Sequence, residues 1–136
     1  RAFTFDPEGN EVTTSFFPEG QLVIDLPSFF KRLPAGENIQ ALTDCQLIIV
    51  TFEEIQLLFH SIPEFREYGR LNIVNQYSAL KERMLSALQE TAEQRYSNLL
   101  SSSPGIFQNV PLKYIASYLG ITDTSLSRIR KEFVKK

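Results

Sequence analysis

The sequence predicts a mixed α+β fold with a strand-rich N-terminal part and a helical C-terminal part. In residues 1–50, short apolar runs are separated by proline, glycine and asparagine, as in a series of short strands. From residue 51 onward, apolar residues recur at the spacing of one helix face. Leu112 to Lys131 then have the residue pattern of a helix-turn-helix.

The first predicted element is a β-hairpin. Phe3 and Phe5 alternate with polar neighbours, and residues 6–10 are rich in turn formers. The alternation of apolar and polar residues resumes over residues 12–16, which predicts the second strand.

The rest of the N-terminal part also predicts short strands. Turn formers at residues 18–20 and 33–36 lie on either side of a short apolar run from Leu22 to Leu26. Two strand-like segments follow, Ile39 to Leu42 and Gln46 to Thr51. Many short strands at close spacing are typical of a β-roll or a β-sandwich, although a piece of this length cannot close a barrel by itself.

Two capping boxes predict where helices begin. Thr51 is followed three residues later by Glu54, and the helix that they open is expected to stop near residues 61–63. Thr91 and Gln94 form a second box, which predicts a short helix just before the helix-turn-helix.

A longer helix is expected from about Pro63 to Ala87, and it carries two apolar stripes. The first has heptad spacing and consists of Ile73, Tyr77, Leu80, Met84 and Ala87, while the second consists of Leu71, Val74, Leu85 and Leu88. One stripe can pack on the strand-rich part while the other meets the same helix of a second subunit. The alternative is that one monomer buries both stripes.

The helix-turn-helix pattern supplies the side chains that two steeply crossed helices need. Ala116 is small where the helices touch, Gly120 lies where the backbone reverses, and aliphatic residues occupy the inner faces. Those aliphatic residues are Ile115, Leu119, Ile121, Leu126 and Ile129. The residues left to point outward are Thr122, Asp123, Thr124, Ser125, Ser127, Arg128 and Lys131. Hydroxyl and basic side chains of this kind bind base edges and phosphates in a major groove, whereas a hairpin that serves only as core does not need them.

The charge is distributed unevenly along the 136 residues, which carry −2 overall. Residues 110–136 hold six basic and two acidic residues, or +4, so residues 1–109 carry −6. A cationic end on an anionic body orients a protein toward a polyanion such as DNA. The alternative is chance clustering of charge at a solvated terminus.

Composition argues against several classes of protein. The apolar runs are too short for a membrane span and the N-terminus lacks the pattern of a signal peptide, so we expect a cytoplasmic protein with no membrane partner. Cys45 is the only cysteine, so we expect no internal disulfide and no structural zinc, and we expect Cys45 to be buried. His60 is the only histidine and has no nucleophile motif beside it, so we expect neither catalysis nor a cofactor.

Six short segments of the sequence resemble those of a known family. They are Gly9–Val12, Phe17–Gly20, Ile62–Phe65, Glu93–Tyr96, Pro111–Ile121 and Leu126–Arg130. Together with the order of the predicted parts, they resemble the Crp/Fnr family of bacterial transcription regulators, in the branch found in Bacteroidetes. The resemblance covers the whole chain. It implies a partial cyclic-nucleotide-binding-like sensor domain over residues 1–88, which begins partway through its β-roll and includes a dimerisation helix over about residues 63–87. Residues 89–136 then form a helix-turn-helix, winged-helix-like DNA-binding domain.

The resemblance also bears on ligand binding. In cyclic-nucleotide-binding members, a Gly–Glu pair holds the ribose, and an Arg followed by Ser or Thr holds the cyclic phosphate. Ile24 and Asp25 fall on the first pair, and Ala35 and Gly36 fall on the second. Asp25 can accept a ribose hydroxyl, but Ala35 cannot pair with a phosphate. We therefore expect no response to cAMP and leave the effector of this candidate pocket unassigned.

Roles within the DNA-binding part follow the same resemblance. Arg128 matches the arginine that reads guanine, whose fork can bond O6 and N7 for about 1–3 kcal/mol of discrimination. Thr124 and Ser125 lie where the helix enters the groove, and Thr124 replaces a glutamate that is frequent in the family. Asp123, with Thr122, is expected to cap the helix. Phosphate contacts are expected from Lys113, Arg130 and Lys131.

The expected partners are double-stranded DNA, a second copy of the chain and RNA polymerase. A dimer would place two recognition helices about 34 Å apart, which predicts an inverted-repeat site. The alternative is a ligand-sensing or protein-interaction module whose helix-turn-helix contacts a protein.

Overall fold

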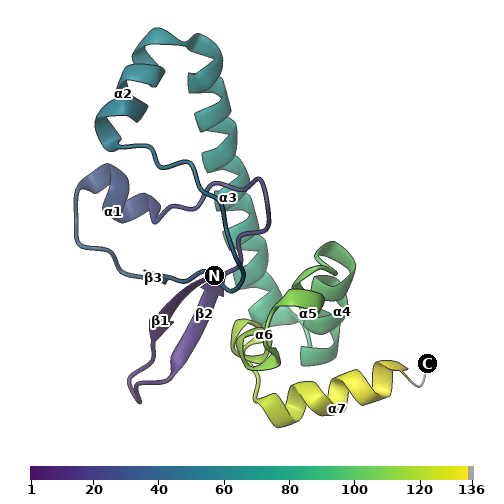
Figure 1. The fold of residues 1–136 in the computed structure, drawn as a ribbon. Coiled ribbons are helices and arrows are strands. Elements are labelled where there is room, and N and C mark those ends of the chain that lie inside the picture. The colour runs from purple at the N-terminus through teal and green to yellow at the C-terminus, as the bar shows by residue number, and fades with distance from the viewer. Residues whose placement is uncertain (135–136) are drawn as a thin grey trace. The chain divides into compact units, whose positions relative to one another are not determined.

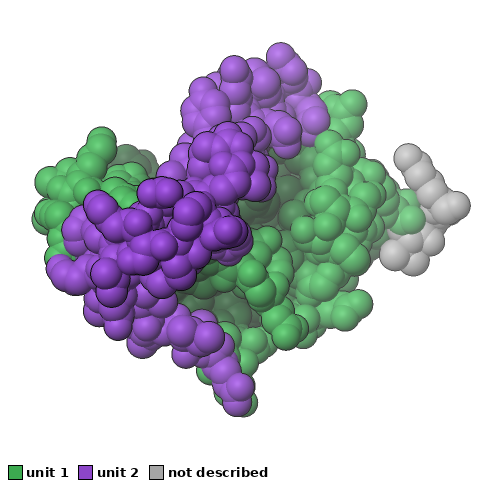
Figure 2. Space-filling model, turned by 90° about the horizontal axis from the view of Figure 1, so that it is seen from above, with its two compact units in different colours: residues 1–45, 91–136 green, residues 46–90 purple. Residues whose placement is uncertain are grey.

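The computed structural model describes residues 1–134 and shows an α+β fold (Figure 1). Within those residues, an antiparallel sheet of three strands is accompanied by seven helices. The chain divides into two compact units, one formed by residues 1–45 with those from Thr91 onward and the other by Gln46–Glu90 (Figure 2). The predicted α+β class is confirmed.

The predicted N-terminal hairpin is confirmed. Strand β1 (Ala2–Phe5) pairs antiparallel with β2 (Glu11–Ser15), and the short strand β3 (Asn38–Ile39) pairs with the other edge of β1. At the turn between β1 and β2, the Asp6 carboxylate accepts a 2.7 Å hydrogen bond from the Asn10 amide. Gly9 has a φ of 85°, a left-handed conformation that glycine adopts without strain.

The remaining strand predictions for residues 1–51 differ from the structure at three segments. The chain forms helix α1 (Leu26–Lys31) after the apolar run, because Pro27 in the first turn favours a helix start. The segment 39–42 contributes only the end of β3, and the segment 46–51 forms no strand.

Residues 46–50 show why the strand prediction fails. A strand requires a neighbour for its amide and carbonyl groups, and no described strand lies beside this segment. Ile48 and Ile49 are 95% and 86% exposed, as expected for an extended segment without a sheet. Cys45, at the start of the same stretch, is exposed and not buried as predicted.

The unit of residues 46–90 is a pair of helices, α2 (Phe52–Ser61) and α3 (Pro63–Gln89). The predicted capping box begins α2, since Thr51 Oγ1 accepts from the Glu54 amide at 3.3 Å and the Glu54 carboxylate accepts from the Thr51 amide at 2.7 Å. Phe59 packs over Gly69 of α3, where a Cβ atom would lie 2.6 Å from the ring. Glycine is therefore needed where the two helices approach each other.

Both apolar stripes of α3 are exposed. Tyr77 and Leu80 of the heptad seam are each 65% exposed, and Leu88 of the second stripe is 77% exposed. The other large apolar residues of the stripes, which are Leu71, Ile73, Val74, Met84 and Leu85, are between 37% and 54% exposed. The large apolar side chains of both stripes are therefore at least 37% exposed in the described chain.

Four helices make up the C-terminal part. They are α4 (Ala92–Ser102), α5 (Ile106–Asn109), α6 (Leu112–Leu119) and α7 (Asp123–Val134). The second predicted capping box is present at the start of α4, where Thr91 Oγ1 accepts from the Gln94 amide at 3.2 Å. The buried core of this part consists of Tyr96, Ile115, Ala116, Leu119, Leu126 and Ile129. Four of the five aliphatic residues predicted for the inner faces are in this core, and Ile121 packs against it half-buried.

The compact units divide the chain differently from the predicted domains. The change at residues 90 and 91 lies close to the expected boundary, but residues 1–45 group with the helix-turn-helix and not with the long helix. Within this unit, β2 lies along α6, as Figure 1 shows, and the rings of Phe16 and Tyr118 are 5.0 Å apart.

Gly120→Ala is expected to lower the free energy of unfolding by about 1–2 kcal/mol, because alanine disfavours the left-handed φ of 67° found there. An added Cβ would meet no atom within 4 Å, so the effect is confined to the backbone. Gly105→Ala is the matched control, since that residue has a φ of −62° and equally open surroundings. Urea unfolding of both variants measures the difference, and an equal loss in both would contradict the explanation.

Candidate nucleic-acid interface

The turn between α6 and α7 is short because Gly120 reverses the chain. Its φ of 67° and ψ of 36° let the Gly120 amide bond the Ser117 carbonyl at 3.1 Å. The Ile121 amide bonds the Ala116 carbonyl at 3.0 Å. These bonds satisfy carbonyls at the end of α6 and allow α7 to begin three residues after the glycine.

The cap of α7 is Thr122, one of the two residues predicted for that role, while Asp123 lies within the helix. Thr122 Oγ1 accepts from the Ser125 amide at 3.2 Å and donates to Ser125 Oγ at 3.0 Å. Asp123 is the first residue of the helix, where its carboxylate interacts favourably with the helix dipole. The hydroxyls of Thr122 and Ser125 are therefore engaged with each other and with the backbone.

The exposed face of α7 carries most of the predicted DNA-binding residues. Thr124, Ser127, Arg128 and Lys131 are exposed, while Leu126 and Ile129 on the opposite face are 0% and 1% exposed. This division follows from the helical period, because burial of one face turns the other toward solvent. We call the exposed set Thr124, Ser127, Arg128 and Lys131 the reading face.

Three other predicted DNA-binding residues lie outside the reading face. Lys113 is exposed on α6, with its Nζ 4.8 Å from the centre of the Tyr114 ring. Ser125 and Arg130 are half-buried, so they are less accessible than the four residues of the reading face.

Sequence reasoning missed an acidic residue beside the reading face. The pKa of Glu93, in the first turn of α4, is lowered by hydrogen bonds from its own backbone amide and from the Thr91 side chain. The positive charges of Arg128 and Arg95 lower it further. A carboxylate therefore lies near the guanidinium that was predicted to read guanine. No local pattern signals this, because α4 and α7 are brought together only by the fold.

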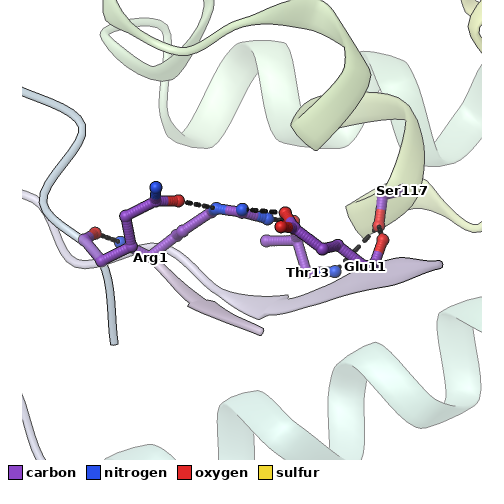
Figure 3. A network of polar contacts seen from close by, with 5 residues as sticks. Arg1, Glu11, Thr13 and Ser117 are labelled. Atoms are coloured by element: carbon purple, nitrogen blue, oxygen red, sulfur yellow. Dashed lines mark hydrogen bonds and ion pairs between the residues drawn. The ribbon is translucent and has the colours of Figure 1, made fainter. Parts of the chain in front are cut away.

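A polar network joins the N-terminal hairpin to α6 (Figure 3). Ser117 Oγ accepts from the Thr13 amide at 2.8 Å and donates to the Glu11 carbonyl at 3.1 Å. The Arg1 guanidinium pairs with the Glu11 carboxylate and donates to Thr13 Oγ1 at 3.1 Å. It also lies 3.5 Å from the centre of the Tyr114 ring, a cation–π contact with α6.

The residues of the candidate ligand pocket are brought together only in part. The Gly36 amide donates to Asp25 Oδ2 at 3.2 Å, so that oxygen already has a partner. Ala35 and Gly36 are exposed. Within residues 1–134, no group of histidine, cysteine, aspartate and glutamate side chains is arranged to hold a metal ion.

No family model and no curated protein matches the chain. Among the described residues, no helix combines the length and apolar character that a bilayer crossing requires.

Thr122→Ala is expected to lower the free energy of unfolding by about 1 kcal/mol, because the helix loses its N-cap hydrogen bond. Thr124→Ala, two residues along, removes an exposed hydroxyl and is expected to change stability by less than about 0.5 kcal/mol. Thermal unfolding of the two variants distinguishes the roles. A larger loss for Thr124→Ala would show that the cap has been assigned to the wrong residue.

Proposed function

We propose that the chain is a sequence-specific DNA-binding regulator of transcription, of the type represented by the Crp/Fnr family. The observation that carries this proposal is the division of α7 into an aliphatic inner face and the reading face. A helix that served only as core would gain nothing from exposed threonine, serine and arginine at one-turn spacing.

Each residue of the reading face has a chemical role in this proposal. Arg128 donates both arms of its fork to guanine O6 and N7 in the major groove. Thr124 and Ser127 lie within one turn of Arg128 and supply short hydroxyls for neighbouring base edges. Lys131 and Lys113 bind phosphates, which adds affinity without sequence preference. Arg130 is half-buried, and its proposed role is also a phosphate contact.

The proposed DNA-binding assembly is a dimer of two copies of the chain. Helix α3 has 27 residues, is about 40 Å long and exposes a heptad seam, which is the pattern of a two-helix interface. Two copies joined along this seam would present two reading faces to successive turns of DNA, about 34 Å apart. The DNA site is then an inverted repeat.

Selection of bound sites from a pool of random duplexes tests the function directly. We expect enrichment of an inverted repeat with a guanine in each half-site, and we expect cAMP to leave binding unchanged because Ala35 cannot pair with its phosphate. If the chain retains no duplex at low salt, the protein-interaction function replaces this one.

Arg128→Ala is expected to remove the preference for one base pair in each half-site, at about 1–3 kcal/mol per site, while Lys131→Ala weakens all sequences alike. The salt dependence also separates them, because loss of a phosphate contact reduces the slope of log K against log salt by about 1. Titration of the selected duplex and of single-base variants at several salt concentrations measures both effects. The same uniform loss for both variants would contradict the assigned roles.

Leu80→Glu is expected to convert a dimer into a monomer, because it places a carboxylate in the centre of the heptad seam. The helix itself should persist, since the side chain is 65% exposed in the single chain. Asn75→Glu adds the same charge at an exposed polar position outside the seam and should leave the dimer intact. Sedimentation equilibrium measures the mass, and a monomeric wild-type chain would refute the dimer.

A further inference from the structure

The hairpin and the helix-turn-helix line one groove of about 770 Å³. Its lining includes Asp6, Asn10 and Glu11 from the hairpin, and Lys113, Thr122 and Asp123 from the helix-turn-helix. All six residues belong to one compact unit, so their arrangement is defined within that unit. The start of α7 and Lys113, which is proposed to bind phosphate, therefore line the same groove as acidic residues of the hairpin.

The two hairpin carboxylates differ in how far their charge is balanced. Glu11 is paired with the Arg1 guanidinium, whose side chain is fully buried against it. Asp6 is held by neutral donors, since the Asn10 amide and side-chain nitrogen bond its carboxylate at 2.7 Å and 3.0 Å. These bonds lower the pKa of Asp6, so its carboxylate stays ionised at neutral pH. Asp6 is thus the uncompensated anion on the hairpin side of the groove.

The hairpin is docked on α6 by hydrogen bonds from one serine and by aromatic contacts. Ser117 Oγ makes both hydrogen bonds to the backbone of β2, as Figure 3 shows. Arg1 stacks on Tyr114, and Phe16 contacts Tyr118 at 5.0 Å between ring centres. Phe16 also packs against the aliphatic core of the helix-turn-helix, whereas Ser117 is not part of that core, so loss of the Ser117 hydrogen bonds weakens the docking and leaves the core in place.

We propose that the β1–β2 hairpin, docked on α6 through Ser117, competes with DNA for the groove beside Lys113 and the start of α7. This inference rests on the proposed DNA-binding function and adds a means of regulation to it. A phosphate bound by Lys113 would lie in the groove that the Asp6 carboxylate shares, so hairpin docking and phosphate binding oppose each other by like-charge repulsion. Release of the hairpin from Ser117 raises the affinity for DNA.

Ser117→Ala tests the docking contact. The variant loses both hydrogen bonds to β2, while alanine supports the α-helix well, so the fold of α6 is retained. We expect about threefold to tenfold tighter binding of the selected duplex, together with faster hydrogen exchange at the Thr13 amide in the absence of DNA. Unchanged or weaker DNA binding by this variant, with its Thr13 amide released, would overturn the proposal.

Asp6→Asn tests the charge and has a matched control in Glu8→Gln. Asparagine keeps the oxygen that accepts from the Asn10 amide, so the turn is preserved. Both variants remove one negative charge. Glu8, however, lies exposed in the turn and does not line the groove. We expect Asp6→Asn to bind DNA about twofold to fivefold more tightly at low salt, with a smaller gain at high salt, and Glu8→Gln to gain less. Equal gains in the two variants would attribute the effect to net charge alone and overturn the competition.

The outcomes separate this inference from the proposed function. If the wild-type chain binds DNA and neither Ser117→Ala nor Asp6→Asn exceeds the control, the competition is rejected and DNA binding stands. If no variant retains a duplex at low salt, even with the hairpin released, the DNA-binding function is rejected and the competition with it.

Discussion

The left-handed turn at Gly120 is the constraint on which the reading face depends. It lets α7 begin close to the end of α6, so that the two helices bury a shared set of aliphatic side chains. Because Leu126 and Ile129 are buried, the helical period places Thr124 and Arg128 on the exposed face of α7. The polar surface proposed to bind DNA is thus a consequence of how the apolar surface is packed.

The same helix that supplies the core also receives the N-terminal hairpin. Ser117 and Tyr114 face away from the aliphatic core and contact residues more than a hundred positions earlier in the chain. A change at the hairpin can therefore reach the start of α7 through one helix. In the proposed regulator, α6 therefore connects the N-terminal strands to the helix-turn-helix, and Phe16 packs directly against its core.

The unit of residues 46–90 has the opposite character, because much of its apolar surface is exposed. Ile48 and Ile49 precede the two helices, and the seam of α3 leaves Tyr77 and Leu80 largely exposed. Exposed apolar surface of this extent is typical of an interaction site. The heptad spacing of the seam favours another helix as its partner, which agrees with the proposed dimer.

The sequence by itself determined the features whose hydrogen bonds close within a few residues. The capping boxes at Thr51 and Thr91, the hairpin turn at residues 6–10 and the reversal at Gly120 all belong to this group. The inner faces of the helix-turn-helix were predictable as well, because a period of 3.6 residues separates buried from exposed positions.

Only the tertiary structure decided the features that need a distant partner. Residues 46–51 have strand-like composition but no neighbouring strand among the described residues, so composition alone was misleading. The exposure of Cys45, the nearness of Glu93 to Arg128 and the docking of the hairpin on Ser117 likewise depend on segments far apart in the chain. A local sequence pattern indicates which secondary structure a segment prefers, whereas the tertiary fold determines which other segments it contacts.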